Sequence, residues 1–417
     1  MYSIVGALKH YPWGSTDAIP TLLGTPPDGT PWAEYWLGAH PDGPSTTADG
    51  QRLDDRIRQH PESLGDGSRT LFGDRLPFLV KLLSAASPLS IQAHPSRAQA
   101  QAGHARENDA GMAPDSPLRS FRDDWPKPEI IIALDTFDAL MGFREPAETA
   151  RLLGALAVDE LAHVVSILAA AEPTADATRE AFLAVFGTAT QEMATALTAA
   201  LAEDRPADGA DVQFRETARL ITGAHPNDPS VLAALMLHRC RLEKWEALFA
   251  PAGTMHAYLR GVGVEVMGAS DNVVRGGLTG KHVDLSVLTE IGDFQPAAPS
   301  PLTPREVASG LLTYETGAPE FRVWLVRSPE GILHLPADDR ARIVVGLSGE
   351  LTLHGATPAL VIGGEAVFVD AGEPLAVSGH GEAVLVSSAH DPVPTVAPVS
   401  ESSSLRSSAR RTPSRSR

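Results

Sequence analysis

The stretch "WEALFAPAGTMHA", residues 245–257, has a second, diverged copy later in the chain. That copy is "GEAVFVDAGEPLA", residues 364–376, and both copies read as an apolar strand that runs into a glycine turn. A repeated strand and turn predicts two related β-modules of the barrel or jelly-roll kind. The first copy has His256 where the second has Leu375, so we expect a polar site in the first module only.

The sequence on either side of the repeat extends this prediction. Residues 1–95 and 245–398 consist of short apolar runs separated by Gly and Pro turns, which is typical of strands. Residues 145–243 are rich in Ala, Leu and Glu, with apolar residues three and four apart, which predicts helices. We therefore expect a mainly β fold with an α-helical insertion, in which two jelly-roll modules accompany a helical domain.

The domain boundaries follow from these changes in composition. We expect the first β-domain to comprise residues 1–145 and 244–300, with a short helical insert at 96–120. The helical domain would then be residues 146–243, and a second β-domain without metal ligands would be residues 301–398. We expect residues 399–417 to form a disordered Ser/Arg tail.

Charge and cysteine content limit the classes of function. The formal net charge of −18 disfavours binding to nucleic acid or to anionic membranes, so we expect a small-molecule partner. An anionic substrate would then need a local cluster of Lys and Arg. The single cysteine, Cys240, cannot form an intrachain disulfide, and the N-terminus has no secretory signal pattern. These features predict a cytoplasmic protein without a membrane span. They leave the oligomeric state open, and a monomer is plausible.

Four residues have the side chains that metal ions prefer. Gln92 and His94 lie two apart after an apolar run, so a strand would place both on one face. Glu129 opens the apolar run "EIIIA", and His256 follows a glycine turn. Singly, His94 and Glu129 are more often structural than metal-binding, and that alternative stays open. The pattern Pro-x-Gly-x-x-His at 251–256 is similar to a metal-binding motif of the cupin superfamily, in which the His is a ligand.

The segment "HAYLRGVGVEVMGASDNVVRGGLTGKHVDL", residues 256–285, is more specific. It resembles the type I phosphomannose isomerase family at nearly every fixed position. The departures are Gly268 and Gly276 where the family has Ala, and Gly280 where it has Pro. The stretches "AEYWLGAHPDGPS" (33–45) and "LPFLVKLLSAASPLSIQAHP" (76–95) also resemble this family.

The resemblance implies an aldose–ketose isomerase that interconverts mannose 6-phosphate and fructose 6-phosphate through an enediol. It places one Zn²⁺ per chain on Gln92, His94, Glu129 and His256, a set of two imidazoles and two oxygen donors that suits zinc. Because Gln92 is neutral where a carboxylate could stand, we hypothesise that it keeps the ion positive toward the sugar oxygens.

The same resemblance puts Arg275 at the reacting end of the substrate. Glu265, Asp271 and Lys127 are the predicted groups for proton transfer or for orienting it. Lys81, Lys281 and Ser90 are the predicted contacts to the substrate or its phosphate.

One departure leaves the catalytic base unassigned. The family often has Asn-His before Lys-Pro-Glu, and this chain has Trp125-Pro126 there. A mechanism that uses that His as the base cannot operate here, and we favour Lys127 or Glu265. The sequence keeps two alternatives open: a non-catalytic double-cupin protein that binds or senses a sugar, and a metal-dependent cupin oxygenase.

Overall fold

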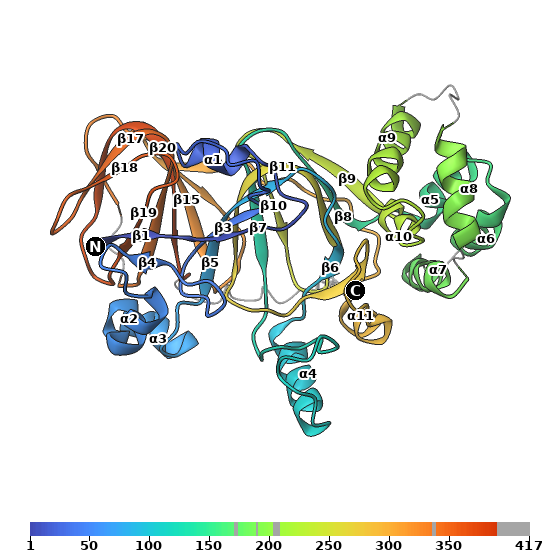
Figure 1. Ribbon diagram of the computed structural model, residues 1–417, viewed down its shortest axis with the longest axis horizontal. Helices are drawn as coiled ribbons and strands as arrows, with labels where there is room; N and C mark the ends of the chain where they lie inside the picture. The colour runs from blue at the N-terminus through green and yellow to red at the C-terminus, as the bar shows by residue number, and fades with distance from the viewer. Residues whose placement is uncertain (171–173, 189–190, 203–208, 336–338, 390–417) are drawn as a thin grey trace, which may run out of the picture.

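The computed structural model describes residues 1–170, 174–188, 191–202, 209–335 and 339–389, so the predicted tail at 399–417 lies outside the described residues. This part of the chain holds two antiparallel sheets side by side, each of ten strands, with helices around them (Figure 1). The prediction of a mainly β fold with an α-helical insertion is confirmed. No described helix is long and apolar enough to cross a membrane.

The first sheet is built around its longest strand, β11 (His256–Gly268). It also contains β2 (Ala7–Lys9), β3 (Glu34–Leu37), β5 (Phe78–Ala85), β6 (Ile91–Ala93), β7 (Glu129–Ala133), β8 (Phe137–Phe143), β9 (Leu237–Leu242), β10 (Ala247–Ala250) and β12 (Val274–Gly277). The first part of β11 pairs with β6 and β8, and the second part pairs with β5 and β7. Gly261 lies at the change of partners with a φ of +141°, and a Cβ there would meet the Phe137 ring at 2.6 Å. The glycine thus lets one strand turn from one group of partners to the other.

The second sheet holds the C-terminal strands, on the left of Figure 1. Its members are β1 (Tyr2–Val5), β4 (Thr46–Thr47), β13 (Arg305–Ala308), β14 (Leu311–Tyr314), β15 (Arg322–Arg327), β16 (Leu333–His334), β17 (Arg342–His354), β18 (Ala359–Val361), β19 (Ala366–Val369) and β20 (Ala376–Ser387). The two copies of the sequence repeat form β10 in the first sheet and β19 in the second. Leu375, the counterpart of His256, packs in the apolar core of the second module.

Three strands pair across the boundaries that composition suggested. β1 and β4 come from the N-terminal segment but pair in the second sheet, β1 with β19 and with β4. β9 ends the segment expected to be helical, and it pairs with β8 of the first sheet. Alternation of apolar residues indicates that a strand forms, but it does not say which sheet the strand joins.

Helices α5 (Pro146–Gly154), α6 (Ala162–Ala169), α7 (Thr174–Thr188), α8 (Gln191–Ala202), α9 (Gly209–Ala224) and α10 (Val231–Leu235) form the helical part on the right of Figure 1. Their apolar faces pack with Ile91 of β6 and Val274 of β12 in one buried cluster. The helical part thus supports the strands that carry Gln92 and Arg275. The other helices are α1 (Ala18–Leu22), α2 (Leu53–Gln59), α3 (Asp66–Phe72), α4 (Arg97–Asp109) and α11 (Leu285–Ile291), with single 3₁₀ turns at Pro61–Leu64 and Asp159–Leu161.

The two sheets share an apolar core that fixes which face of the first sheet carries polar groups. Val80, Ile130 and Val264 of the first sheet pack in one cluster with Ile343 and Phe368 of the second. Each such side chain contributes roughly 1.5–3 kcal/mol when fully buried. Because strand side chains alternate, the intervening residues of β5, β7 and β11 point to the opposite face.

Candidate active site

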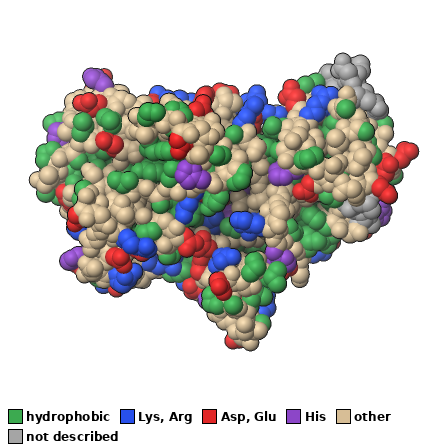
Figure 2. All heavy atoms as spheres, viewed as in Figure 1, with side chains coloured by type: hydrophobic (Ala, Val, Ile, Leu, Met, Phe, Trp, Pro, Cys, Tyr) green, Lys and Arg blue, Asp and Glu red, His purple; other side chains and the backbone are tan. Residues whose placement is uncertain are grey.

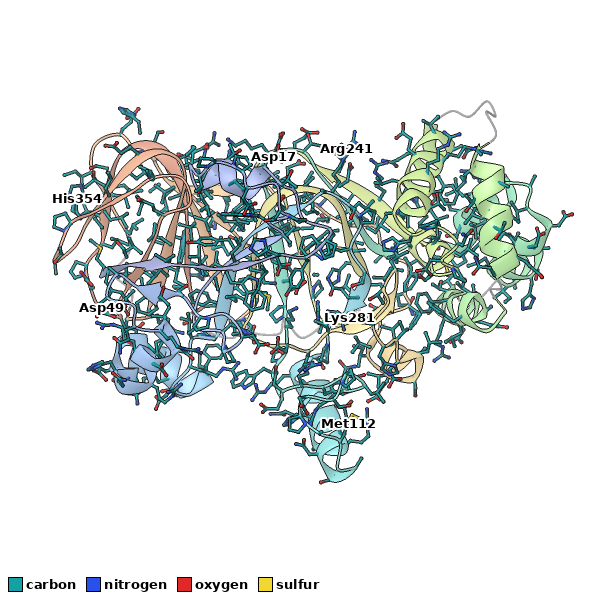
Figure 3. All side chains as sticks on the ribbon, viewed as in Figure 1. Asp17, Asp49, Met112, Arg241, Lys281 and His354 are labelled. Carbon is teal, nitrogen blue, oxygen red and sulfur yellow. The ribbon has the colours of Figure 1, made fainter. Side chains whose placement is uncertain are left out.

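A pocket of about 1150 Å³ opens on that opposite face of the first sheet. The predicted site residues that line it are Lys81, Ser90, Gln92, Lys127, Glu129, Glu265, Asp271, Arg275 and Lys281. The remaining two, His94 and His256, are only 2% and 1% exposed and lie directly behind Glu129. The fold therefore brings the whole predicted set together. On the face shown in Figure 2, Lys and Arg side chains gather near the centre of the molecule, and Figure 3 places Lys281 at the lower edge of the first sheet.

A buried cluster of His94, Glu129 and His256 has the geometry of a metal site. Oε2 of Glu129 lies 3.3 Å from Nε2 of His94 and 3.2 Å from Nε2 of His256. One possible ligand atom from each residue lies within 4.8 Å of the other two. The three residues lie far apart in sequence, so their convergence is a property of the fold.

The outer nitrogens of both imidazoles fix their tautomers. Nδ1 of His94 donates to the backbone oxygen of Asn272 at 2.7 Å, and Nδ1 of His256 donates to that of Thr254 at 2.9 Å. In neutral rings this leaves both Nε2 lone pairs facing a carboxylate oxygen, and Nε2 of His94 has no hydrogen-bond partner among the described residues. Lone pairs that converge in this way repel one another unless a cation lies between them. The donor set therefore fits a metal ion such as Zn²⁺.

The protonation states agree with this arrangement. Burial lowers the pKa of His94 to about 4, so the ring is neutral. Burial alone would raise the pKa of Glu129, but the charge of the Lys127 ammonium, 3.0 Å away, opposes this and holds that pKa below its usual range. The cluster thus offers one carboxylate and a neutral imidazole at ordinary pH.

Gln92 takes its place through strand register. It pairs with His256 of β11 on one side and with Arg275 of β12 on the other. Residues directly opposite in an antiparallel pair point to the same face of the sheet, so Gln92 shares one face with His256 and Arg275. Gln92 and Arg275 line the pocket on that face.

A second buried cluster lies beside the metal-type cluster. Nζ of Lys81 is 2.8 Å from Glu265 and 3.6 Å from Glu34. Burial would lower the pKa of Lys81, but the two carboxylates outweigh it and raise that pKa. Burial raises the pKa of Glu265 and Lys81 opposes this. Glu34 was missed in the sequence, where only its position in "AEYWLG" hinted at it; Nε1 of Trp36 fixes it with a 2.8 Å hydrogen bond.

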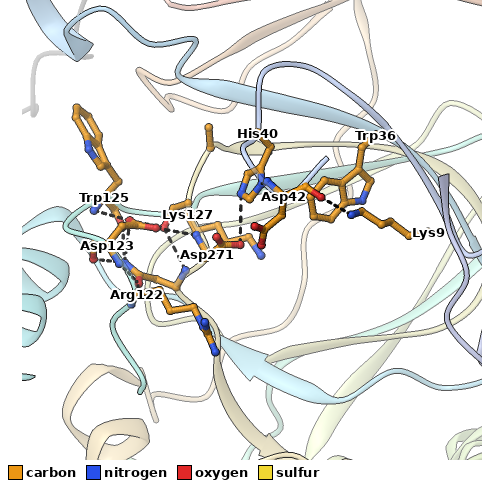
Figure 4. A network of polar contacts seen from close by, with 12 residues as sticks. Lys9, Trp36, His40, Asp42, Arg122, Asp123, Trp125, Lys127 and Asp271 are labelled. Atoms are coloured by element: carbon orange, nitrogen blue, oxygen red, sulfur yellow. Dashed lines mark hydrogen bonds and ion pairs between the residues drawn. The ribbon is translucent and has the colours of Figure 1, made fainter. Parts of the chain in front are cut away.

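Asp271 lies at the mouth of the pocket and has a partner that the sequence did not predict. Nε2 of His40 is 3.3 Å from Oδ1 of Asp271 (Figure 4). Burial would raise the pKa of Asp271, but the contact with His40 and the charge of Lys127 hold it below its usual range. The carboxylate is 40% exposed, so it stays ionised and accessible from the pocket.

Three basic side chains form what we call the cationic end of the pocket. Arg122, Arg275 and Lys281 all line it. Burial and the charge of Arg122 lower the pKa of Arg275, while burial and both arginines lower that of Lys281. Like charges that lower one another's pKa values interact through space, so the three cations share one region of the pocket. Arg122 was missed because no sequence signal placed it beside the other two.

Trp125 and Pro126, which stand where the family often has Asn-His, are not among the described residues that line the pocket. The Trp125 ring instead lies between two guanidinium groups, with Arg97 at 3.5 Å and Arg75 at 4.2 Å from its centroid. This position is structural, so Trp125 does not take over the role of a missing base.

Comparisons with known proteins agree with the geometry. Residues 1–146 match the model of the phosphomannose isomerase type I catalytic domain. The chain is 34% identical to mannose-6-phosphate isomerase of Salmonella typhimurium over 91% of this chain and 98% of that one, and 34% identical to that of Escherichia coli over the same shares.

Solved structures give the same relationship. A crystal structure of mannose 6-phosphate isomerase bound with zinc and yttrium is 31% identical, with a TM-score of 0.83 over 93% of this chain and 99% of that chain. A variant of phosphomannose isomerase from Salmonella typhimurium superposes with a TM-score of 0.84 at 30% identity, over the same shares. Sequence, fold and site geometry agree that this chain belongs to the type I phosphomannose isomerase family.

Proposed function

We propose that this chain interconverts mannose 6-phosphate and fructose 6-phosphate as a zinc-dependent aldose–ketose isomerase. The observation that carries the proposal is one pocket in which the His94–Glu129–His256 cluster lies next to buried acid–base groups and to a cationic end. An enzyme that moves a proton on a sugar phosphate needs these three parts together.

We assign the zinc ligands to His94, Glu129, His256 and Gln92. The first three offer converging donor atoms, and Gln92 is held opposite His256 in register. When bound, the ion would polarise the sugar oxygens and stabilise the negative charge that develops on them.

The proton between C1 and C2 needs a group that can accept and return it. Glu265, Lys127 and Asp271 are the residues we assign to this step, because all three line the pocket. Lys81 supports Glu265 by its 2.8 Å contact. Arg275, beside Gln92, is placed to stabilise an enediol oxygen.

The phosphate group would bind at the cationic end. Lys281 and Arg122 supply charge there, and Ser90 adds a hydroxyl group to the pocket lining. Arg122 extends the set that the sequence indicated.

We also propose a division into a first β-domain of 1–145 and 244–300, a helical domain of 146–243 and a second β-domain of 301–398. Strands β1 and β4 would then pair within the second β-domain, and strand β9 of the helical domain would pair within the first. We expect a cytoplasmic protein that does not bind nucleic acid, since the charge of −18 and the single, buried Cys240 favour this. The oligomeric state stays open, and a monomer is plausible.

A coupled assay tests the proposal. Purified, zinc-replete protein is given mannose 6-phosphate, and fructose 6-phosphate is converted onward to a measured product. We expect turnover that a chelator abolishes and added Zn²⁺ restores. Absence of fructose 6-phosphate with zinc bound would end the proposal, and oxygen consumption instead would favour the oxygenase class.

A further inference from the structure

The segment that carries Lys127 to the pocket lacks regular secondary structure, yet a dense polar network fixes it. Residues 122–128 belong to neither a helix nor a strand. Their shape depends on side-chain hydrogen bonds to residues 270–272, which lie far away in sequence (Figure 4).

Asp123 is the centre of this network. Its Oδ1 accepts from the backbone N–H of Trp125 at 2.8 Å and from Oγ of Ser270 at 2.8 Å. Its Oδ2 accepts from the backbone N–H of Asp271 at 2.8 Å. One carboxylate therefore holds both the backbone before Lys127 and the backbone of Asp271.

Asn272 completes the network from the other side and is fully buried. Its Nδ2 donates to the backbone oxygens of Asp123 and Trp125, each at 2.8 Å, and its Oδ1 accepts from the N–H of Arg122 at 2.7 Å. Its Nδ2 also lies 3.3 Å from Oδ1 of Asp123, so the two side chains fix each other.

The same asparagine reaches the metal-type cluster. Its backbone oxygen accepts the Nδ1 proton of His94 at 2.7 Å, and this bond leaves Nε2 of His94 facing Glu129. Bonds of this kind orient a ligand imidazole, and their loss typically costs 10–100-fold in metal affinity. Asp123 thus binds the backbone of Asp271 directly and reaches His94 through Asn272. It also fixes the backbone two residues before Lys127.

We propose that Asp123 is a positioning residue of this site. It does not line the pocket, and it acts by locking residues 122–125 to residues 270–272. The lock keeps the ring of His94, the ammonium of Lys127 and the carboxylate of Asp271 in fixed relative places. The kinetic part of this inference rests on the proposed isomerase function, whereas the zinc part does not.

The test compares Asp123→Asn with Asp124→Asn. Both replace one aspartate in the same segment, but the Asp124 side chain is 44% exposed and pairs with Arg97 at 3.3 Å, outside the network. In Asp123→Asn an amide with only one acceptor oxygen replaces a carboxylate that accepts bonds on both oxygens. Zinc affinity is measured on metal-free protein by competition with a chromophoric chelator, and kcat and KM are measured after zinc loading.

We expect Asp123→Asn to raise the zinc dissociation constant about tenfold. We expect kcat to fall about tenfold or more with little change in KM, because the groups around the reacting carbons are misplaced. Asp124→Asn should leave both quantities close to those of the parent protein. The proposal would be overturned if the Asp123→Asn variant lost only thermal stability and kept the zinc affinity and kcat of the parent protein.

A milder variant keeps the test decisive if Asp123→Asn does not fold. Ser270→Ala removes one donor to Asp123 and leaves the carboxylate in place. It should weaken zinc binding and kcat in the same direction, and parent-like values for both would overturn the proposal. If the parent protein does not isomerise mannose 6-phosphate, the proposed function fails, and zinc affinity alone still decides the role of Asp123.

Discussion

Gln92 of β6 lies directly opposite His256 of β11, and both side chains point to the same face of the sheet. Arg275 takes the equivalent place on the other side of Gln92. If Gln92 and His256 bind zinc as proposed, Glu129 is the single carboxylate in the ligand set, and the neutral amide leaves the ion with a net positive charge. That charge would favour the transition state, in which the sugar oxygens become negative.

Gln92→Glu should therefore retain zinc but isomerise the sugar phosphate more slowly. We expect kcat to fall about tenfold, which corresponds to about 1.4 kcal/mol of transition-state stabilisation. Zinc content per chain and kcat are measured on the same preparation. Gln101→Glu, at an exposed position of α4, is the matched control and should behave as the parent does. An unchanged kcat with zinc retained would contradict the role of the amide.

His256→Leu gives the first module the residue that the second module has at the equivalent position, Leu375. We expect the variant to fold and to lose zinc, because leucine fills the space but donates no electron pair. Circular dichroism and metal analysis measure the two outcomes. The reverse change, Leu375→His, should keep zinc but lower the free energy of unfolding by about 1–3 kcal/mol, since it buries an unpaired polar group. A His256→Leu protein that still holds one zinc per chain would rule out His256 as a ligand.

The sequence predicted which residues gather around the pocket better than it predicted which strands pair. Lys281, Arg275 and Asp271 lie in one continuous motif with His256, so a local pattern was sufficient to find them. Glu34, His40 and Arg122 come from other segments, and only the register of β3 with β5 and the folded 122–125 segment bring them to the pocket. The pairing of β1 with β19 was equally hidden, because both are short apolar strands with many possible partners.

Lys81→Met should destabilise the fold as well as the chemistry. It leaves the carboxylates of Glu265 and Glu34 buried without their cation, at a cost of about 3–5 kcal/mol in the free energy of unfolding. The double variant Lys81→Met/Glu265→Gln should recover a large part of that loss. Urea unfolding of the metal-free proteins measures both values.

The matched control for Lys81 is Lys244→Met. Lys244 pairs with Glu382 at 3.1 Å but is half exposed, so its loss should change stability by less than about 1 kcal/mol. Equal effects at the two lysines would contradict a special role for burial at Lys81.

The pH dependence of KM tests the cationic end of the pocket. Burial and the two neighbouring arginines lower the pKa of Lys281, so its charge is present at neutral pH and is lost, as pH rises, earlier than in an ordinary lysine at about 10.4. KM for the sugar phosphate should therefore begin to rise at a lower pH than the loss of charge of an ordinary lysine would produce. Lys281→Arg should flatten this rise, whereas Lys244→Arg should not. A KM that does not respond to pH in the parent protein would remove Lys281 from the phosphate site.

The most direct test of the isomerase assignment follows the sugar itself. Zinc-loaded protein is incubated with mannose 6-phosphate in D₂O, and the carbon-bound protons at C1 and C2 are observed by NMR. We predict that fructose 6-phosphate appears and that part of it carries deuterium at C1, because a protein group moves the proton. Folded protein with one zinc per chain that leaves mannose 6-phosphate unchanged would contradict the account.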